Sequence, residues 1–375
     1  MSRYFSKIGS VVREHLWWFE DVFLPFGVTR IALVLVGVVM AQIIPPSPFM
    51  PSQGWQFSPH KVIDIWGRWD SGWYMSIVEH GYSVVTNAEG QANYAFFPLY
   101  PYLVRLFYAL VPSLYRTRGT ALLIGIMVSN LAFLGALTVL HHLVRTLRQD
   151  RHLARDSIWY LCVFPASFAF SSFYAESLFL LLSITAFYAA ERREWWLAGL
   201  AGGLAALSRP PGVLVFIPLA LLYWQREQAV RRHAIFLGLI PAGFLLYVLA
   251  IYRLTGDPLA WLTIHNKWTT YHPYSPLEQI DQASVIIATF MGLIAFKFGI
   301  SYGIWTLILG PLGFLTKGPA AFVSATRYTS TAFPAFMGLS LLSQRRHWLF
   351  TSITVVLSML LAIFMMLWAR YYWVQ

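Results

Sequence analysis

An aspartate set among aromatic residues is the first candidate for chemistry in this sequence. Asp70 lies in the segment WGRWDSGWYMSIVEHGY. If a helix begins at Trp69, three- and four-residue spacings place Trp73 and Tyr74 on the same side as this carboxylate, which could accept a proton. The pattern fits equally well an interfacial helix, in which Asp70 and Ser71 are caps and the aromatic residues lie in the headgroup region.

Two arginines at interrupted apolar segments could bind phosphate. Arg209 lies in LSRPPGVLVF, where two prolines break the run, and Arg327 and Tyr328 lie in SATRYTSTAFPAF at the start of another run. A guanidinium suits phosphate because its planar fork donates two parallel hydrogen bonds. For a single arginine at a membrane boundary, snorkelling toward lipid headgroups is the competing interpretation.

Two further carboxylates, those of Glu176 and Asp257, lie between apolar stretches or in an expected turn. Glu176, in SFYAESLFLLL, lies between apolar stretches, where an unpaired charge is costly, so we expect it to pair with an arginine or a ligand. Asp257, in TGDPLAW, fits a turn before a short helix that it would cap. The segment NYAFFPLYPYLVRL, broken by two prolines, fits either a binding wall or a kinked interfacial segment.

Composition predicts that lipid surrounds most of the elements that position these residues. Of 375 residues, 58% are hydrophobic and only 11% are charged, which excludes a soluble domain with an ordinary charged surface. The formal charge of +11 comes from short basic clusters between apolar runs, a pattern typical of cytoplasmic loops rather than nucleic-acid binding. We therefore predict an all-α polytopic membrane protein that forms one domain over residues 1–375.

A transmembrane helix needs roughly 20 apolar residues, and runs of about this kind, some of them shorter, recur through the chain. We expect about eleven spans, near residues 29–46, 119–143, 157–173, 175–190, 195–208, 211–224, 233–254, 284–297, 300–316, 324–342 and 347–369.

The distribution of basic residues predicts which side each loop faces. We place the N-terminus inside, and residues 94–111 outside without crossing the membrane. Of the 27 Lys and Arg residues, 16 then fall inside, including Arg30 and every basic cluster. Two long outer loops result, at 47–118 and 255–283. The candidate acidic and basic residues then lie on the outer face, which suggests a site there.

Several catalytic and ligand-binding patterns are absent from the sequence. There is no phosphate loop, GxGxxG, zinc-ligand spacing, HExxH or DxD pair. We expect neither a metal nor another cofactor. The single cysteine, Cys162, lies in an apolar segment and is expected to be a packing residue.

The ordered set RWDSGWY, FFPLYPYLVR, FYAESLFLLL, SRPPG, TGDPLAW and RYTSTAFPAF resembles the PIG-V family of mannosyltransferases over Trp66 to Met337. The resemblance implies a GT-C fold, a polyprenyl-phosphate sugar donor, a lipid or glycolipid acceptor, and Asp70 as the catalytic base. The doubled proline of SRPPG departs from the single proline expected in the family. The compact chain suggests a bacterial or archaeal plasma membrane.

In that reaction the acceptor hydroxyl loses a proton as it attacks the anomeric carbon, and the departing phosphate needs cationic stabilisation. Arg209 and Arg327, with Arg68 as a third, are the predicted phosphate ligands. A single displacement with one base predicts inversion. The predicted substrate-binding residues are Trp69, Trp73, Tyr74, Glu176, Asp257 and Tyr328.

A polytopic transporter or lipid flippase is the main alternative. It would be expected to show internal symmetry and helices broken near the membrane midplane. The prolines at 218, 241 and 311 interrupt predicted spans, but no internal repeat is evident. Another lipid-linked sugar, such as glucose or arabinose, fits the sequence as well as mannose does, because hydroxyl selectivity depends on pocket geometry.

Overall fold

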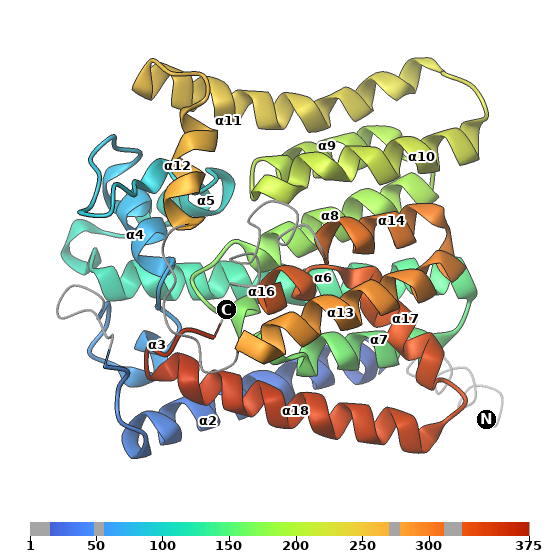
Figure 1. Ribbon diagram of the computed structural model, residues 1–375, viewed down its shortest axis with the longest axis horizontal. Helices are drawn as coiled ribbons and strands as arrows, with labels where there is room; N and C mark the ends of the chain where they lie inside the picture. Colours follow the sequence, from blue (N-terminus) through green and yellow to red (C-terminus); the bar gives the residue numbers. More distant parts are fainter. Residues whose placement is uncertain (1–15, 49–55, 270–277, 311–324, 375) are drawn as a thin grey trace, which may run out of the picture.

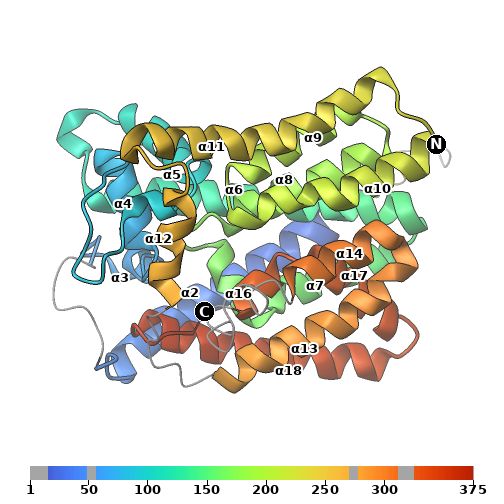
Figure 2. The same cartoon turned by 45° about the horizontal axis from the view of Figure 1, so that its top comes forward.

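The computed structural model describes residues 16–48, 56–269, 278–310 and 325–374, and within these ranges the chain forms helices and turns and no β-strand. Long helices lie side by side along the long axis, and α4, α5 and α12 gather at one end of the bundle in both views (Figures 1 and 2). The elements are η1 Phe19–Phe23, α2 Leu24–Ile43, α3 Lys61–Asp64, α4 Ser71–His80, η2 Asn93–Ala95, α5 Leu99–Ala109, η3 Ser113–Tyr115, α6 Arg118–Arg148, α7 Arg151–Val163, η4 Pro165–Phe170, α8 Glu176–Glu191, α9 Trp195–Ala206, η5 Pro210–Val215, α10 Phe216–Glu227, η6 Arg232–Gly238, α11 Leu239–Thr255, α12 Ala260–Thr269, α13 Glu278–Ala295, η7 Phe296–Phe298, α14 Ile300–Leu309, α16 Ala325–Ser330, α17 Phe333–Ser343 and α18 His347–Ala369.

Four helical segments in the described part of the chain are long and apolar enough to cross a membrane. They are Leu16–Ile43, Arg118–Arg148, Arg232–Thr255 and His347–Ala369. Shorter apolar helices, such as Trp195–Ala206 and Phe333–Ser343, pack among them. The first long segment begins well before the expected start at residue 29, and Glu20 and Asp21 lie within it.

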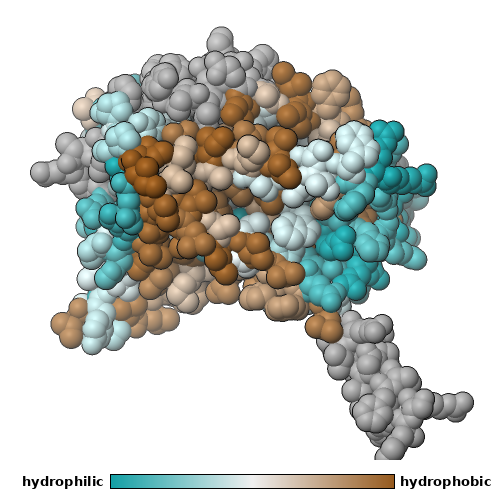
Figure 3. Space-filling view, turned by 90° about the horizontal axis from the view of Figure 1, so that it is seen from below, coloured by the Kyte–Doolittle hydropathy of each residue, from teal (hydrophilic) through white to brown (hydrophobic). Residues whose placement is uncertain are grey.

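Hydrophobic side chains cover the middle of the face to which α2 and α18 contribute, with hydrophilic side chains on either side (Figure 3). Ile31, Leu35, Val355 and Met359 are all more than half exposed there. An aqueous surface would not tolerate such a band, whereas lipid solvates it. The protein is an integral membrane protein.

The turn between α6 and α7 is defined by local capping. Gln149 ends α6 in the left-handed conformation, with φ of 55°. Asp150 then caps α7, accepting a hydrogen bond from the Leu153 backbone N–H at 3.0 Å. A two-residue connection of this kind forces the two helices to run antiparallel.

The helices also meet at close backbone contacts. At Gly243 of α11, an added Cβ would lie 2.3 Å from the carbonyl oxygen of Gly203 on α9. Only glycine permits this approach, which is typical of helix pairs in lipid.

The predicted breaks near residues 174 and 209 are confirmed. Helix α7 ends at Val163, the η4 turns follow, and α8 begins at Glu176. Helix α9 ends at Ala206, and η5 begins at Pro210. The expected run at 324–342 is divided instead, because α16 ends at Ser330 and α17 begins at Phe333, one residue before Pro334. Part of the expected run at 300–316 lies outside the described residues.

The segment expected to lie outside contains η2 and the short helix α5. The 11 residues of α5 extend about 16 Å at 1.5 Å per residue, roughly half of a hydrocarbon core.

Arg30 is buried within α2. The prediction that it is one of the basic residues in the loops on the inner side of the membrane is therefore wrong. Its guanidinium donates to the Ser167 carbonyl at 2.7 Å, the Ser167 hydroxyl at 2.7 Å and the Cys162 carbonyl at 3.2 Å. These acceptors lie at the end of α7 and in η4, where the break leaves carbonyls without helical partners. The buried Arg30 guanidinium therefore donates hydrogen bonds to backbone carbonyls with which lipid could not hydrogen-bond.

Arg30→Ala should lower the free energy of unfolding by about 3 kcal/mol, because these carbonyls lose a charged donor. Thermal unfolding of the purified protein in detergent measures the effect. Arg253→Ala, at an exposed position of α11, is the control and should change little. Equal unfolding temperatures for the two variants would contradict the assignment.

Candidate functional site

Four charged side chains from distant parts of the chain form one ion-pair cluster. Asp70 precedes α4, Glu176 begins α8, Arg209 precedes η5, and Arg327 lies in α16. Helix packing therefore brings together carboxylates and guanidinium groups that are up to 257 residues apart in sequence.

Arg327 is the central member of the ion-pair cluster. Its Nη1 lies 2.6 Å from Asp70 Oδ2, and its Nε lies 3.3 Å from Glu176 Oε1. Arg209 Nη1 lies 3.2 Å from the same Glu176 oxygen. The four groups alternate in sign, and their formal charges sum to zero.

The cluster is largely withdrawn from solvent. The side chains of Glu176, Arg209 and Arg327 are 2%, 6% and 9% exposed, and that of Asp70 is 14% exposed. Glu176 Oε2 is buried and has no hydrogen-bond partner among the described residues. Asp70 is thus the most accessible member, and Glu176 keeps unused acceptor capacity beside two cations.

Backbone geometry aims Asp70 into the cluster. The preceding residue, Trp69, adopts the left-handed conformation with φ of 49°, which is strained for a bulky residue. Its buried ring lies edge-on to Trp373 at 4.8 Å, which fixes the turn. Helix α4 begins at Ser71 rather than at Trp69, and the Asp70 side chain makes no capping hydrogen bond. Asp70 thus occupies the N-cap position of α4, but its side chain pairs with Arg327 instead of capping the helix.

Tyr174 links the Asp70 turn to the start of α8. Its hydroxyl accepts from the Asp70 backbone N–H at 3.2 Å and donates to the Arg68 carbonyl at 3.2 Å. Its ring lies 5.1 Å from the Arg327 Cζ atom. The sequence pattern did not single out Tyr174, although it precedes Glu176 by two positions in the same motif.

The two prolines after Arg209 set its backbone. A residue before proline is driven out of the helical region, and Arg209 is extended, with φ of −156° and ψ of 153°. Its Cζ atom lies 4.8 Å from the Tyr328 ring. An added Cβ at Gly212 would lie 2.1 Å from the Ala205 carbonyl oxygen, so SRPPG is a compact turn against the end of α9.

With this geometry established, the chain can be compared with known proteins. The sequence profile of the family described as Mannosyltransferase (PIG-V) matches residues 49–245, more than half of the chain. The chain belongs to the PIG-V family. Asp70, Glu176 and Arg209 lie within the matched region, whereas Arg327 joins them only through the fold.

Curated relatives and solved structures extend this comparison. The chain is 30% identical over 150 residues to the GPI alpha-1,6-mannosyltransferase 2 of Mus musculus, which is 39% of this chain and 29% of that protein. The Cricetulus griseus enzyme of the same name is 30% identical over 151 residues, again 29% of its length. The match thus spans less than a third of these relatives.

ArnT from Cupriavidus metallidurans, solved with undecaprenyl phosphate, is similar over 92% of this chain and 76% of its own, with a TM-score of 0.50 and 12% identity. The PIG-V chain has the GT-C fold.

Two residues predicted from the PIG-V motifs lie apart from the cluster. The Arg68 Nη1 atom donates to the Gly67 carbonyl at 2.7 Å and to Asp64 Oδ2 at 3.0 Å, and its Cζ atom lies 4.0 Å from the Tyr371 ring. Asp257 is exposed, and its Oδ1 accepts from the Leu259 N–H at 2.8 Å. Arg68 thus joins its loop to the C-terminal residues and Asp257 shapes a turn, so neither is kept in the proposed site.

The three predicted substrate-binding aromatic residues of the RWDSGWY motif do not all contact the same ring. Trp69 packs edge-on against Trp373. Trp73 lies parallel to Phe96 at 6.1 Å, and Tyr74 meets Phe96 edge-on at 5.1 Å. Burial raises the pKa of Tyr74 well above its ordinary range, and the charges of Glu176 and Asp70 add to the rise against the two arginines. Tyr74 is therefore a neutral phenol beside the cluster, able to donate a hydrogen bond.

Glu176→Gln should lower the free energy of unfolding by about 3 kcal/mol, because two buried guanidinium groups lose their shared counter-charge. The control is Glu194→Gln, whose partner Arg192 is half exposed, and it should change stability by about 0.5 kcal/mol or less. Thermal unfolding in detergent compares the two variants. A Glu176 variant as stable as the control would show that this carboxylate does not stabilise the cluster.

Proposed function

We propose that this PIG-V family chain transfers a hexosyl residue, mannose by family, from a polyprenyl-phosphate donor to a lipid or glycolipid acceptor at the outer membrane face. The ion-pair cluster carries the proposal, because it places one accessible carboxylate beside two buried cations. The positive-inside orientation of the loops supports the outer face.

The two arginines suit the donor phosphate. Arg209 and Arg327 both pair with Glu176, so two guanidinium groups are held close together in the site. When the bond between the anomeric carbon and the phosphate oxygen breaks, its electron pair goes to the phosphate and increases the charge there. Fixed guanidinium groups stabilise that developing charge without further reorganisation. The structure of similar fold that contains undecaprenyl phosphate carries the same class of lipid phosphate.

Asp70 is the proposed base. The acceptor oxygen attacks the anomeric carbon, its proton passes to the Asp70 carboxylate, and the phosphate leaves from the opposite face. A single displacement of this kind inverts the anomeric configuration. The partial exposure of Asp70 lets a hydroxyl approach, which the buried Glu176 does not allow to the same extent.

The ion pair between Asp70 and Arg327 predicts competition for Arg327. Asp70 Oδ2 accepts from Arg327 Nη1 at 2.6 Å, and the donor phosphate would need the same guanidinium. Phosphate binding should draw Arg327 toward the donor and leave the Asp70 oxygen to receive the acceptor proton. The donor would then prepare the base for the acceptor.

Asp70→Asn should reduce turnover by about 10²–10⁴-fold, the range for a lost general base, while binding of polyprenyl phosphate stays equal or becomes tighter. Transfer from radiolabelled polyprenyl-phosphate mannose to a membrane glycolipid extract measures turnover. Asp257→Asn, an exposed position outside the cluster, is the matched control and should remain active.

Wild-type turnover in Asp70→Asn would exclude this residue as the base. Weaker phosphate binding in that variant would instead contradict the competition for Arg327. The wild-type protein could instead transfer no sugar from any polyprenyl-phosphate donor and move lipid across vesicle membranes. That result would support the transporter hypothesis and contradict the proposed enzyme.

Arg327→Gln should weaken polyprenyl-phosphate binding by about tenfold to a hundredfold, the loss of one or two charge-assisted hydrogen bonds. Arg253→Gln, an exposed arginine of α11, should bind as the wild type does. Unchanged affinity in a folded Arg327 variant would assign this arginine to a structural role alone.

A further inference from the structure

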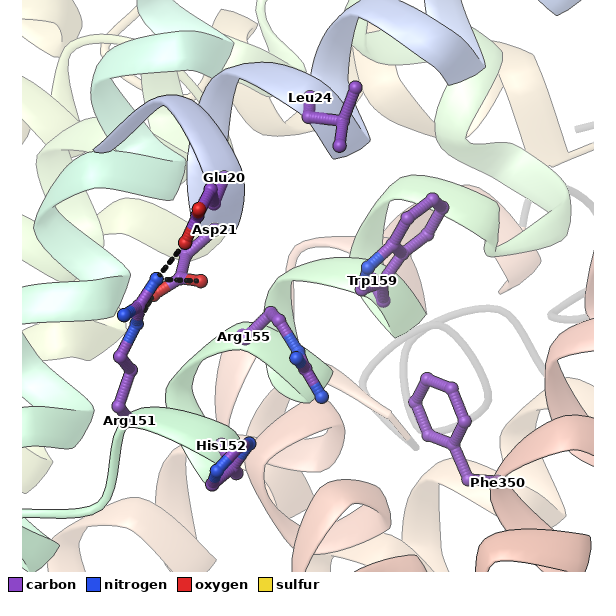
Figure 4. Close-up of a pocket in the computed structure, with 8 residues that line it drawn as sticks. All are labelled: Glu20, Asp21, Leu24, Arg151, His152, Arg155, Trp159 and Phe350. Carbon is purple, nitrogen blue, oxygen red and sulfur yellow. Dashed lines mark hydrogen bonds and ion pairs between the residues drawn. The ribbon is translucent and has the colours of Figure 1, made fainter. Parts of the chain in front are cut away.

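A polar cleft lies where α2, α7 and α18 begin, away from α4, α5 and α12 (Figure 1). Its volume is about 440 Å³. Figure 4 shows its lining, which is Glu20, Asp21, Leu24, Arg151, His152, Arg155, Trp159 and Phe350. None of these residues belongs to the ion-pair cluster, so the cleft has no part in the proposed transfer.

The cleft lies near the starts of two candidate membrane spans, Leu16–Ile43 and His347–Ala369, where we expect lipid headgroups. It is formed by the first turns of helices whose outer surfaces are apolar, and Phe19, Leu24 and Trp348 are all more than a third exposed nearby. Trp159 and Phe350 supply an aromatic side to the cleft itself, as is common at a membrane interface (Figure 4).

Arg151 forms ion pairs with the acidic residues on one side of the cleft. It contacts Glu20 Oε2 at 2.6 Å and Asp21 Oδ2 at 2.6 Å, while Asp21 also lies 3.1 Å from His141 Nε2. Asp21 is buried and fully engaged. Glu20 is 53% exposed, and only its Oε2 has a hydrogen-bond donor among the described residues.

Arg155 and His152 form the basic side. The Arg155 side chain is 41% exposed, and its Nε and Nη2 contact only the neighbouring Asp156, at 3.3 and 3.2 Å. Nη1 has no hydrogen-bond acceptor in the described part of the chain. In Figure 4, Arg155 and His152 extend from α7 into the cleft, on the other side from Glu20.

We propose that this cleft binds a membrane phospholipid whose headgroup carries both a phosphate and a primary ammonium. Arg155 and His152 would donate to the phosphate, and Glu20 would accept from the ammonium. The acyl chains would follow the exposed apolar surfaces beside Leu24 and Phe350. Separated charges on the two sides of the cleft match a zwitterionic headgroup.

The charge balance of the cleft favours this headgroup over an anionic one. The three carboxylates of Glu20, Asp21 and Asp156 outnumber the two guanidinium groups of Arg151 and Arg155, so an anionic headgroup would gain little net attraction. A quaternary ammonium has no N–H to donate to Glu20. The lipid with a primary ammonium therefore uses both sides of the cleft.

Native mass spectrometry of the full chain in detergent tests the proposal, with dioleoyl phosphatidylethanolamine, phosphatidylcholine and phosphatidylglycerol added separately. The wild type should bind phosphatidylethanolamine most tightly. Arg155→Gln should weaken that binding about tenfold, the equivalent of one charge-assisted hydrogen bond. Glu20→Gln should remove the preference for phosphatidylethanolamine over phosphatidylcholine.

Arg192→Gln and Glu194→Gln are the matched controls. They alter an exposed arginine and carboxylate that pair at 2.8 Å outside the cleft, and both should bind lipid as the wild type does. Equal affinity for the three lipids, or unchanged binding in Arg155→Gln, would overturn the proposal. Stronger binding of phosphatidylglycerol would overturn the ammonium assignment, and displacement of the lipid by inorganic phosphate would indicate a free-anion site instead.

Discussion

The bridge that Arg327 makes between Asp70 and Glu176 is the interaction on which the candidate site depends. Each carboxylate alone would be costly in this largely apolar setting, and so would each guanidinium. Joined with Arg209, they form a neutral group whose members lie within 3.3 Å of a partner. Because the pairs are buried, the segments that supply them must hold their positions within a narrow range.

Breaks in the helices position three of the four members of this cluster. Asp70 follows a left-handed residue, Glu176 follows the η4 turns, and Arg209 is extended before Pro210. Each break exposes backbone groups that lipid cannot solvate. Buried side chains compensate, as Arg30 does for the carbonyls near η4 and Tyr174 does beside Asp70. The site therefore requires structural polar groups that take no part in binding substrate.

The two ends of the bundle differ in how their charges are arranged. The cluster containing Arg327 is compact, neutral and closed, so a ligand must compete with internal ion pairs. The cleft beside Arg155 is open, and Glu20 and Arg155 reach it from different helical elements. The first arrangement suits a substrate that reorganises the site, and the second suits a resident lipid that leaves it unchanged.

The sequence by itself determined the membrane-embedded helical class, the PIG-V family and the breaks near residues 174 and 209. Composition and proline placement act locally, so they can be read without coordinates. It also singled out Asp70, Glu176, Arg209 and Arg327, because charges beside apolar runs need a partner. It could not determine which charges meet.

Only the tertiary structure decided the pairing. Arg68 and Asp257 have motif contexts as suggestive as those of the cluster residues, yet Arg68 pairs with the nearby Asp64, and Asp257 remains in an exposed turn. The start of α4 likewise depends on Trp373, which packs on Trp69 from the far end of the chain. Ion pairs and ring contacts act over a few ångströms, and sequence separation says nothing about which side chains come that close.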